Sequence, residues 1–175
     1  AEPLIFLKPS SAIIGHGEAI VIPPQSKQVE LEAELTIVIG KLAKNISEED
    51  SLDYVWGYTI ANDVTARDLQ FNDGQWARSK GFDTFCPLGP WVETEFIPDG
   101  QVIESRINGD TRQNVSISKM THNIRTIVSY VSKNMTLVPG DIILTGSPAG
   151  ISQINSGDLI ECEIEGIGIL ANSVI

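Results

Sequence analysis

Three carboxylates in this chain have the spacing of a small-cation site. Glu32 and Glu34 lie two residues apart in a run, 29–40, that becomes apolar and β-branched towards its end, which predicts a strand. Because residues i and i+2 of a strand point to the same face, both carboxylates can reach one cation. Asp63, from a separate polar segment, is the candidate third ligand. Ligation by oxygen alone favours Mg²⁺, Mn²⁺ or Ca²⁺ over zinc.

The same strand has a second interpretation. Glu30, Glu32 and Glu34 alternate with apolar residues, and this alternation by itself favours a half-exposed strand with a solvated acidic face. Like charges on one face repel each other, and a divalent cation between two of them would relieve the repulsion. The pattern leaves open whether Glu30 or Glu34 would share a cation with Glu32.

A polar turn and a group of basic residues follow. An apolar segment ends at Asn62 and Asp63, either of which could instead cap a helix. Arg67 and Lys80 come next, and cations beside carboxylates suit a site that binds a metal and a carboxylate substrate together. Later, a strand enters a loop of small residues at 145–150, where backbone N–H groups and the hydroxyl of Thr145 or Ser147 could contact an anion.

Strand signals dominate the elements that must position these groups. Expected strands, from β-branched and alternating residues between turns, are 4–7, 30–39, 58–61, 102–107, 142–144, 159–164 and 168–170. Asn108 and Gly109 predict a tight hairpin because both tolerate positive φ. Helices are expected after Ser47, leading to Trp56, and over 121–134, where apolar residues recur at helical spacing. The fold class is therefore one mostly β domain, 1–175, with a few short helices.

Composition narrows the partners. Twelve Lys and Arg against 23 Asp and Glu give a formal net charge of −11, which argues against nucleic acid or an anionic membrane surface as partner. No apolar run is long enough to span a bilayer. Cys86 and Cys162 suit two buried, reduced thiols in a cytoplasmic protein better than a disulfide framework.

Five segments together resemble one known family. They are residues 6–10 (Phe-Leu-Lys-Pro-Ser), 32–35 (Glu-Ala-Glu-Leu), 57–68 (Gly-Tyr-Thr-Ile-Ala-Asn-Asp-Val-Thr-Ala-Arg-Asp), 82–90 (Phe-Asp-Thr-Phe-Cys-Pro-Leu-Gly-Pro) and 139–146 (Pro-Gly-Asp-Ile-Ile-Leu-Thr-Gly). In this order they resemble the fumarylacetoacetate hydrolase family, in its smaller single-domain branch, over nearly the whole chain. The resemblance implies that family's β-sandwich or β-roll fold and a homodimer.

The resemblance also implies a metal site. Carried over by position, it makes Glu32, Glu34 and Asp63 the metal ligands and leaves Glu30 outside the motif. The implied cofactor is Mg²⁺ or Mn²⁺, with Ca²⁺ as a further candidate. Three carboxylates leave octahedral positions open for substrate and water.

Substrate contacts are implied in the same way. Lys80 falls where the family has a catalytic lysine, and Arg67 and Gln70 fall where it contacts substrate or supports the ligands. Ser147 stands where Thr is usual, so a hydroxyl is kept for contact with the substrate. Gly81 stands where Ser is common.

One part of the family pattern is not found in this chain. Hydrolases of the family carry a His and a nearby Glu on a short lid helix upstream of the segment that matches residues 6–10, and this chain begins just before that segment. Neither His16 nor His122 occupies the corresponding position, so neither is assigned the catalytic role. An upstream segment is therefore expected to be absent from the chain.

The resemblance implies chemistry on 2-oxo acids. The family's metal chelates the substrate and stabilises an enolate, and a metal-bound enolate can lead to three outcomes. Hydrolysis of a C–C bond in an acylpyruvate-type substrate is the first expectation, and decarboxylation of oxaloacetate and isomerisation of 2-hydroxyhepta-2,4-diene-1,7-dioate are the alternatives. Two hypotheses of other classes are a catalytically inactive metal-binding module and a β domain stabilised by structural Ca²⁺.

Overall fold

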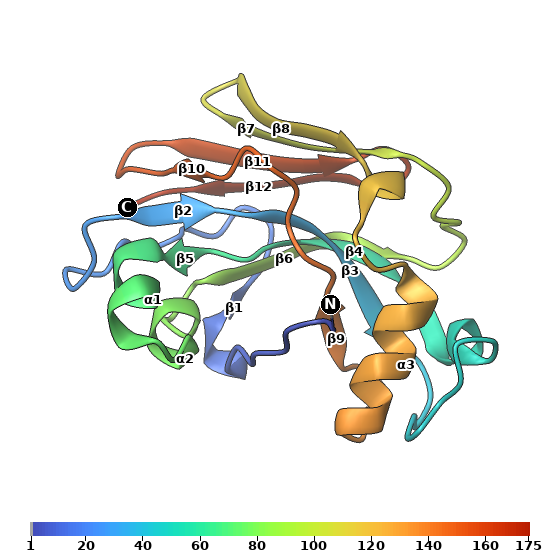
Figure 1. The fold of residues 1–175 in the computed structure, drawn as a ribbon. Helices are drawn as coiled ribbons and strands as arrows, with labels where there is room; N and C mark the ends of the chain where they lie inside the picture. Colours follow the sequence, from blue (N-terminus) through green and yellow to red (C-terminus); the bar gives the residue numbers. More distant parts are fainter. Residues whose placement is uncertain (1) are drawn as a thin grey trace.

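Strands are the main regular secondary structure of the described residues, and turns, loops and short helices join them (Figure 1). A computed structural model describes residues 2–175. The strands are β1 (Ile13–Ile14), β2 (Val29–Leu31), β3 (Ala33–Ile39), β4 (Val55–Asn62), β5 (Thr65–Ala66), β6 (Cys86–Glu93), β7 (Val102–Ile107), β8 (Asp110–Ser116), β9 (Ile142–Leu144), β10 (Ser152–Gln153), β11 (Leu159–Ile164) and β12 (Gly168–Ser173). The helices are α1 (Arg67–Asp73), α2 (Ala77–Lys80) and α3 (Ile124–Asn134), with short 3₁₀ turns at Ser10–Ala12, Ser51–Tyr54 and Ile117–Lys119.

Two larger sheets and one small sheet organise these strands. The five-stranded sheet has the order β1-β6-β4-β3-β9, and the four-stranded sheet has the order β12-β11-β7-β8. A three-stranded sheet, β10-β2-β5, continues beside them. Figure 1 shows α1 and α2 together near β5 and α3 at the other end of the domain, beside β3 and β9. The expected mostly β fold with short helices is confirmed.

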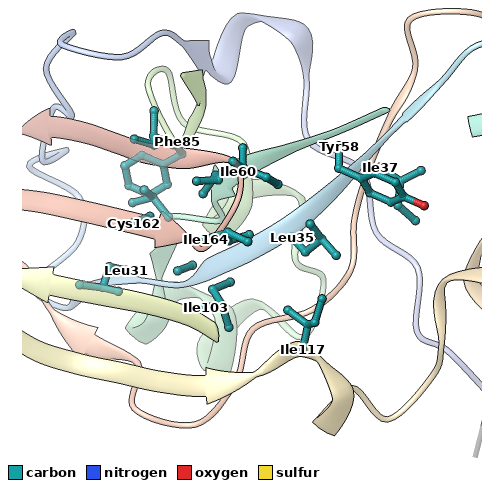
Figure 2. Packing of buried hydrophobic residues seen from close by; sticks show 14 of the residues in the cluster. Leu31, Leu35, Ile37, Tyr58, Ile60, Phe85, Ile103, Ile117, Cys162 and Ile164 are labelled. Atoms are coloured by element: carbon teal, nitrogen blue, oxygen red, sulfur yellow. The ribbon is translucent and has the colours of Figure 1, made fainter. Parts of the chain in front are cut away.

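The hydrophobic core lies between the two larger sheets. Figure 2 shows side chains of β3 and β4, together with Phe85 just before β6, meeting those of β7 and β11. Fully buried members include Leu35, Ile60, Phe85, Cys162 and Ile164. Each large apolar side chain of this kind contributes about 1.5–3 kcal/mol when it is fully buried. Since side chains alternate along a strand, Leu35 in this core leaves the neighbouring Glu34 on the opposite face of β3.

Several elements match their sequence predictions closely. The predicted strands 102–107, 142–144 and 159–164 are β7, β9 and β11, and the helix predicted over 121–134 is α3. The Asn123 side chain accepts a hydrogen bond from the backbone N–H of Thr126 and so caps α3. Asn108 and Gly109 have φ of 53° and 84° and join β7 to β8, as the hairpin prediction requires.

Three predictions about local structure are wrong. Residues 4–7 form no strand, because this segment instead places the Phe6 ring against Trp76 and carries Lys8 into the interior. The helix predicted after Ser47 is a single 3₁₀ turn, because pairing of β4 with β3 takes up the residues that follow. The predicted strand 30–39 is divided into β2 and β3 at Glu32, and the two parts belong to different sheets.

Both cysteines are buried free thiols, as expected from the sequence. Among residues 2–175, no helix combines the length and apolar character needed to cross a membrane.

Candidate metal centre

The break between β2 and β3 brings three carboxylates together. One oxygen each from Glu32, Glu34 and Asp63 lies within 4.8 Å of the other two. Glu32 occupies the break, where its N–H donates to Asn62 Oδ1 (2.9 Å) and its carbonyl accepts from the Asp63 N–H (2.8 Å). These two bonds tie the end of β4 to the start of β3, so the sheet pairing decides how the carboxylates converge.

The acidic strand is not a solvated face, so that interpretation of the alternation is wrong. Glu30, Glu32 and Glu34 are 8 %, 8 % and 3 % exposed, and Asp63 is 1 % exposed. They are buried because α1, α2 and the segment before residue 10 contribute side chains that cover this face. Glu30 lies outside the triad and pairs with Arg67 instead.

Neither Asn62 nor Asp63 caps a helix. Helix α1 begins at Arg67 after Ala66, and no side chain caps it. The Asn62 amide instead holds the break in the strand, and the Asp63 carboxylate accepts hydrogen bonds from two lysines. The polar turn therefore serves the acidic cluster rather than the start of the helix.

Buried cations surround the triad. Lys80 Nζ, at the end of α2, lies 2.5 Å from Asp63 Oδ2 and 3.0 Å from Glu32 Oε2, and it is also 4.8 Å from the centre of the Phe6 ring. Lys8 Nζ lies 2.6 Å from Asp63 Oδ1. Buried charges of both signs cost little only when they are paired as closely as these are.

Arg67 links the triad to its neighbours. Its Nε donates to Glu30 Oε2 (2.7 Å), its Nη2 donates to Glu32 Oε1, and its Nη1 donates to Gln70 Oε1 (2.5 Å). The guanidinium therefore orients Glu32 through a fixed fork of donors. Arg67 and Gln70 thus lie at the site, and in this structure both support a carboxylate of the triad.

The loop after β9 completes the site from the other side. The Gly146 N–H donates to Glu34 Oε2 (2.6 Å), and the Ser147 hydroxyl donates to the Ala33 carbonyl (3.3 Å). The predicted site residues Lys80, Arg67 and Ser147 are therefore all brought to the triad.

Burial determines the electrostatics of the triad and its neighbours. Burial and the nearby Asp63 carboxylate raise the pKa of Glu34 to about 8, although the Gly146 N–H works in the opposite direction. Burial also lowers the pKa of Lys8, and Asp63 partly offsets this effect. A divalent cation would relieve the repulsion between the carboxylate of Glu34 and those packed beside it.

The donor set is consistent with a divalent metal site. Three carboxylates supply only hard oxygen ligands, which Mg²⁺, Mn²⁺ and Ca²⁺ prefer. Among the side-chain hydrogen bonds of residues 2–175, only one carboxylate oxygen of Glu34 has a partner, the Gly146 N–H. The other oxygen is free to bind a ligand.

Sequence reasoning missed two residues of this region. Lys8 lies in the matched segment 6–10, but no role was predicted for it. Its position between Leu7 and Pro9 in that segment was the only signal in the sequence for its contact with Asp63. Gln113 approaches from β8 and contacts the loop through Ser147, and nothing in its local sequence indicated this. Gly81, where a Ser is common in the family, has its Cβ position 2.5 Å from the Ala77 carbonyl, so a side chain there would require the backbone to move.

The two histidines lie apart from the triad contacts. His16 Nδ1 accepts a hydrogen bond from the Ala171 N–H, and His122 lies on the 3₁₀-to-α3 connection. Neither has a hydrogen bond or ion pair with the triad among the contacts of residues 2–175, although His122 lines the same cavity as the loop 145–149.

Comparison with known proteins decides the family. The pattern described as fumarylacetoacetate (FAA) hydrolase, C-terminal, matches residues 1–175. The chain belongs to the fumarylacetoacetate hydrolase family. It is therefore an enzyme of that family. The family resemblance and the fold inferred from the sequence are both confirmed.

Relatives with named activities extend the comparison. A 5-carboxymethyl-2-hydroxymuconate delta-isomerase from Mycobacterium smegmatis superposes with a TM-score of 0.99 at 46 % identity, covering 100 % of this chain and 70 % of its own. A 2-hydroxyhepta-2,4-diene-1,7-dioate isomerase from Mycobacterium marinum has a TM-score of 0.99 at 48 % identity, covering 100 % and 69 %. A mitochondrial oxaloacetate tautomerase from Xenopus laevis is 44 % identical in an alignment 186 positions long, which covers 99 % of this chain and 58 % of that protein.

Proposed function

We propose that this protein is a divalent-metal-dependent enzyme that moves a proton within a 2-oxo acid, as an isomerase or tautomerase does. The buried triad of Glu32, Glu34 and Asp63, set among buried cations, is the observation that carries this proposal. The relatives named above are isomerases and a tautomerase, and their names favour proton transfer over the C–C hydrolysis expected from the sequence.

In this proposal the triad holds Mg²⁺ or Mn²⁺. When bound, the cation supplies a Lewis acid for the carboxylate and 2-oxo oxygens of the substrate. Lys80 Nζ keeps a fixed positive charge beside Glu32 and Asp63, where negative charge grows as a 2-oxo acid loses the proton next to its carbonyl group. Arg67 holds Glu32 in place and is itself hydrogen-bonded to Gln70. The Ser147 hydroxyl, which donates to the Ala33 carbonyl in this structure, would turn from that carbonyl to donate to the substrate carboxylate.

The test compares the protein with and without metal. With oxaloacetate as the substrate, enol–keto conversion is followed by ultraviolet absorbance after EDTA treatment and again after Mg²⁺ or Mn²⁺ is added back. Because oxaloacetate also tautomerises without enzyme, each rate is compared with that of a protein-free mixture. We expect EDTA to lower the rate to the protein-free value and the metal to restore the excess. Asp63→Asn should show neither an excess rate nor restoration, because the uncharged amide is a weak ligand for a hard cation. An undiminished excess rate in EDTA, or in Asp63→Asn, would contradict the proposal.

Hydrolysis of an acylpyruvate is the second candidate, and the description of the matched family as a hydrolase favours it. Parallel assays on acetylpyruvate hydrolysis, oxaloacetate decarboxylation and oxaloacetate tautomerisation rank the three reactions under one set of conditions. Calorimetric binding of Mn²⁺ without turnover in any assay would instead indicate a catalytically inactive metal-binding module.

The homodimer and the cytoplasmic location inferred from the sequence stay predictions. Light scattering of the purified protein measures the first, and fractionation of cells measures the second.

A further inference from the structure

Gln113 joins the second sheet to the loop that borders the triad. Its side chain is fully buried, and it makes four hydrogen bonds. Nε2 donates to the Ser147 hydroxyl (2.7 Å) and to the Pro148 carbonyl (2.8 Å). Oε1 accepts from the Ala33 N–H (3.1 Å) and from the Ser105 hydroxyl (2.8 Å). These bonds use both donors and both acceptor positions of the amide.

The partners fix which way the amide faces. A backbone N–H at Ala33 requires the oxygen, and a backbone carbonyl at Pro148 requires the nitrogen, so the amide has a single satisfactory orientation. A glutamate at position 113 could accept the first bond but, when ionised, could not donate the second. The site therefore requires the two-sided chemistry of an amide.

The local backbone turns this side chain towards the loop. The pairing of β7 with β8 shifts register between Ser105 and Arg106, immediately beside Gln113. Such bulges redirect side chains near functional sites. Gly150, at φ of 104°, lies so close to β8 that a Cβ would be 2.2 Å from the Arg112 carbonyl. The loop 145–150 is thus seated on β8 at two neighbouring points.

Hydrogen bonds hold the middle of this loop, among them those from the Gly146 N–H to Glu34 (2.6 Å) and from the Ser147 hydroxyl to the Ala33 carbonyl (3.3 Å). Leu35, Ile103 and Ile117 line a cavity against which residues 145–149 also lie. Since a cavity offers no packing atoms on that side, hydrogen bonds must set the position of the loop there. Thr145 anchors the start of the loop to the Leu35 carbonyl (2.8 Å), and Gln113 anchors the part that follows.

We propose that Gln113 is a positioning residue for the metal centre. It connects Ala33, which lies between Glu32 and Glu34, to the loop that gives Glu34 the Gly146 N–H. It therefore sets the distance between the triad and the groups that meet the substrate carboxylate. The inference rests on the proposed function, because it assumes that the triad binds a cation and a 2-oxo acid.

The test uses Mn²⁺ and oxalate as probes, measured by calorimetry on the whole chain. Gln113→Glu keeps the acceptors for Ala33 and Ser105 but loses both donors to the loop. Asn172→Asp is the matched control, because the buried amide of Asn172 on β12 also donates two hydrogen bonds, in this case to the carbonyls of Gly15 and Glu18. Gln113→Met removes all four hydrogen bonds while keeping a similar length.

We expect both Gln113 variants to bind oxalate about 10-fold more weakly or worse at saturating Mn²⁺. The size of the loss corresponds to the two hydrogen bonds to the loop that both variants lack. Asn172→Asp should bind oxalate within about 3-fold of the parent protein despite a comparable fall in Tm, since that bond pair lies elsewhere.

Each other outcome is decisive. Parent-like oxalate affinity in Gln113→Glu, or an equal loss in Asn172→Asp, overturns the inference and leaves the proposed function intact. Failure of both Gln113 variants to fold, seen by circular dichroism, makes Gln113 a structural residue and also overturns it. If the parent protein binds neither Mn²⁺ nor oxalate, the proposed function fails, and the inference fails with it.

Discussion

Replacing Arg67 with Met tests whether the buried charges depend on one another as the structure indicates. Arg67 pairs with Glu30 and Glu32, and the three side chains are only 13 %, 11 % and 10 % exposed. Arg67→Met keeps most of the apolar length and removes the charge. Glu30 then remains buried without a cation, although it keeps a hydrogen bond from Gln28 (2.7 Å), and Glu32 keeps only Lys80 Nζ, at 3.0 Å.

The size of the effect follows from this burial. Removing one partner of a buried ion pair costs about 3–5 kcal/mol, because the remaining charge stays uncompensated. For a domain of 175 residues each kcal/mol shifts Tm by about 2–4 °C. We therefore expect Arg67→Met to lower Tm by about 6–20 °C in EDTA.

Mn²⁺ should reduce the difference in Tm between Arg67→Met and the parent protein. A cation held at 100 times its Kd stabilises the folded state by about 2.7 kcal/mol. Glu32 belongs to the triad, so the cation replaces part of the charge that Arg67 supplied, whereas Glu30 lies outside and gains nothing. The variant should thus gain more Tm from Mn²⁺ than the parent protein does.

The assay is a thermal melt of both proteins in EDTA and in Mn²⁺, with Arg106→Met as the control. Arg106 also pairs with carboxylates, those of Glu104, Glu161 and Glu163, but its side chain is 18 % exposed and its partners are 23–39 % exposed. More exposed pairs contribute about 1 kcal/mol or less each, so its loss should be smaller and independent of Mn²⁺. A Tm loss for Arg67→Met no larger than that of Arg106→Met would refute the reasoning about burial. A difference in Tm between Arg67→Met and the parent protein that Mn²⁺ leaves unchanged would refute the role of Glu32 as a ligand.

Two further predictions concern single side chains. Lys80→Met should raise Mn²⁺ affinity by about 10-fold or more and lower oxalate affinity, because the ammonium beside Glu32 and Asp63 repels a cation and attracts an anion. Calorimetry measures both affinities, and an unchanged Mn²⁺ affinity would contradict this prediction. Burial raises the pKa of Cys162 to about 12 from an ordinary value near 9, so its contribution to stability is complete below pH 9 and is lost as the pH rises towards 12. The difference in unfolding free energy between the parent protein and Cys162→Ala, measured from pH 8 to pH 11, should shrink with pH, and a constant difference would exclude this linkage.

Local sequence was sufficient wherever the deciding interactions are local. The hairpin at Asn108 and Gly109 requires positive φ, and these two residue types supply it. The apolar stripe of α3 needs only helical spacing and a cap, both visible in the sequence. Glu32, Glu34 and Asp63 could be named from their motifs, and the structure brings their oxygens together.

Local patterns failed where a distant partner decides the outcome. Alternation predicted a solvated acidic face, because a period of two reports which residues share a face but not what covers it. Cover comes from Lys8, Arg67 and Lys80, whose segments are remote from the strand in sequence. The helix predicted after Ser47 failed for the same reason, since pairing with β3 overrides a local propensity.

Residue types and their spacing predicted a mostly β domain and the hairpin at Asn108 and Gly109, and the resemblance to the family selected Glu32, Glu34 and Asp63 over Glu30. The convergence of these carboxylates could not be predicted from spacing, because it depends on a break at Glu32 that Asn62 holds from another strand. The contacts of Gln113 are likewise tertiary, since its four partners lie on β3, on β7 and in the loop after β9. Hydrogen bonds and ion pairs of this kind act over a few ångströms in space, and spacing along the chain carries no record of them.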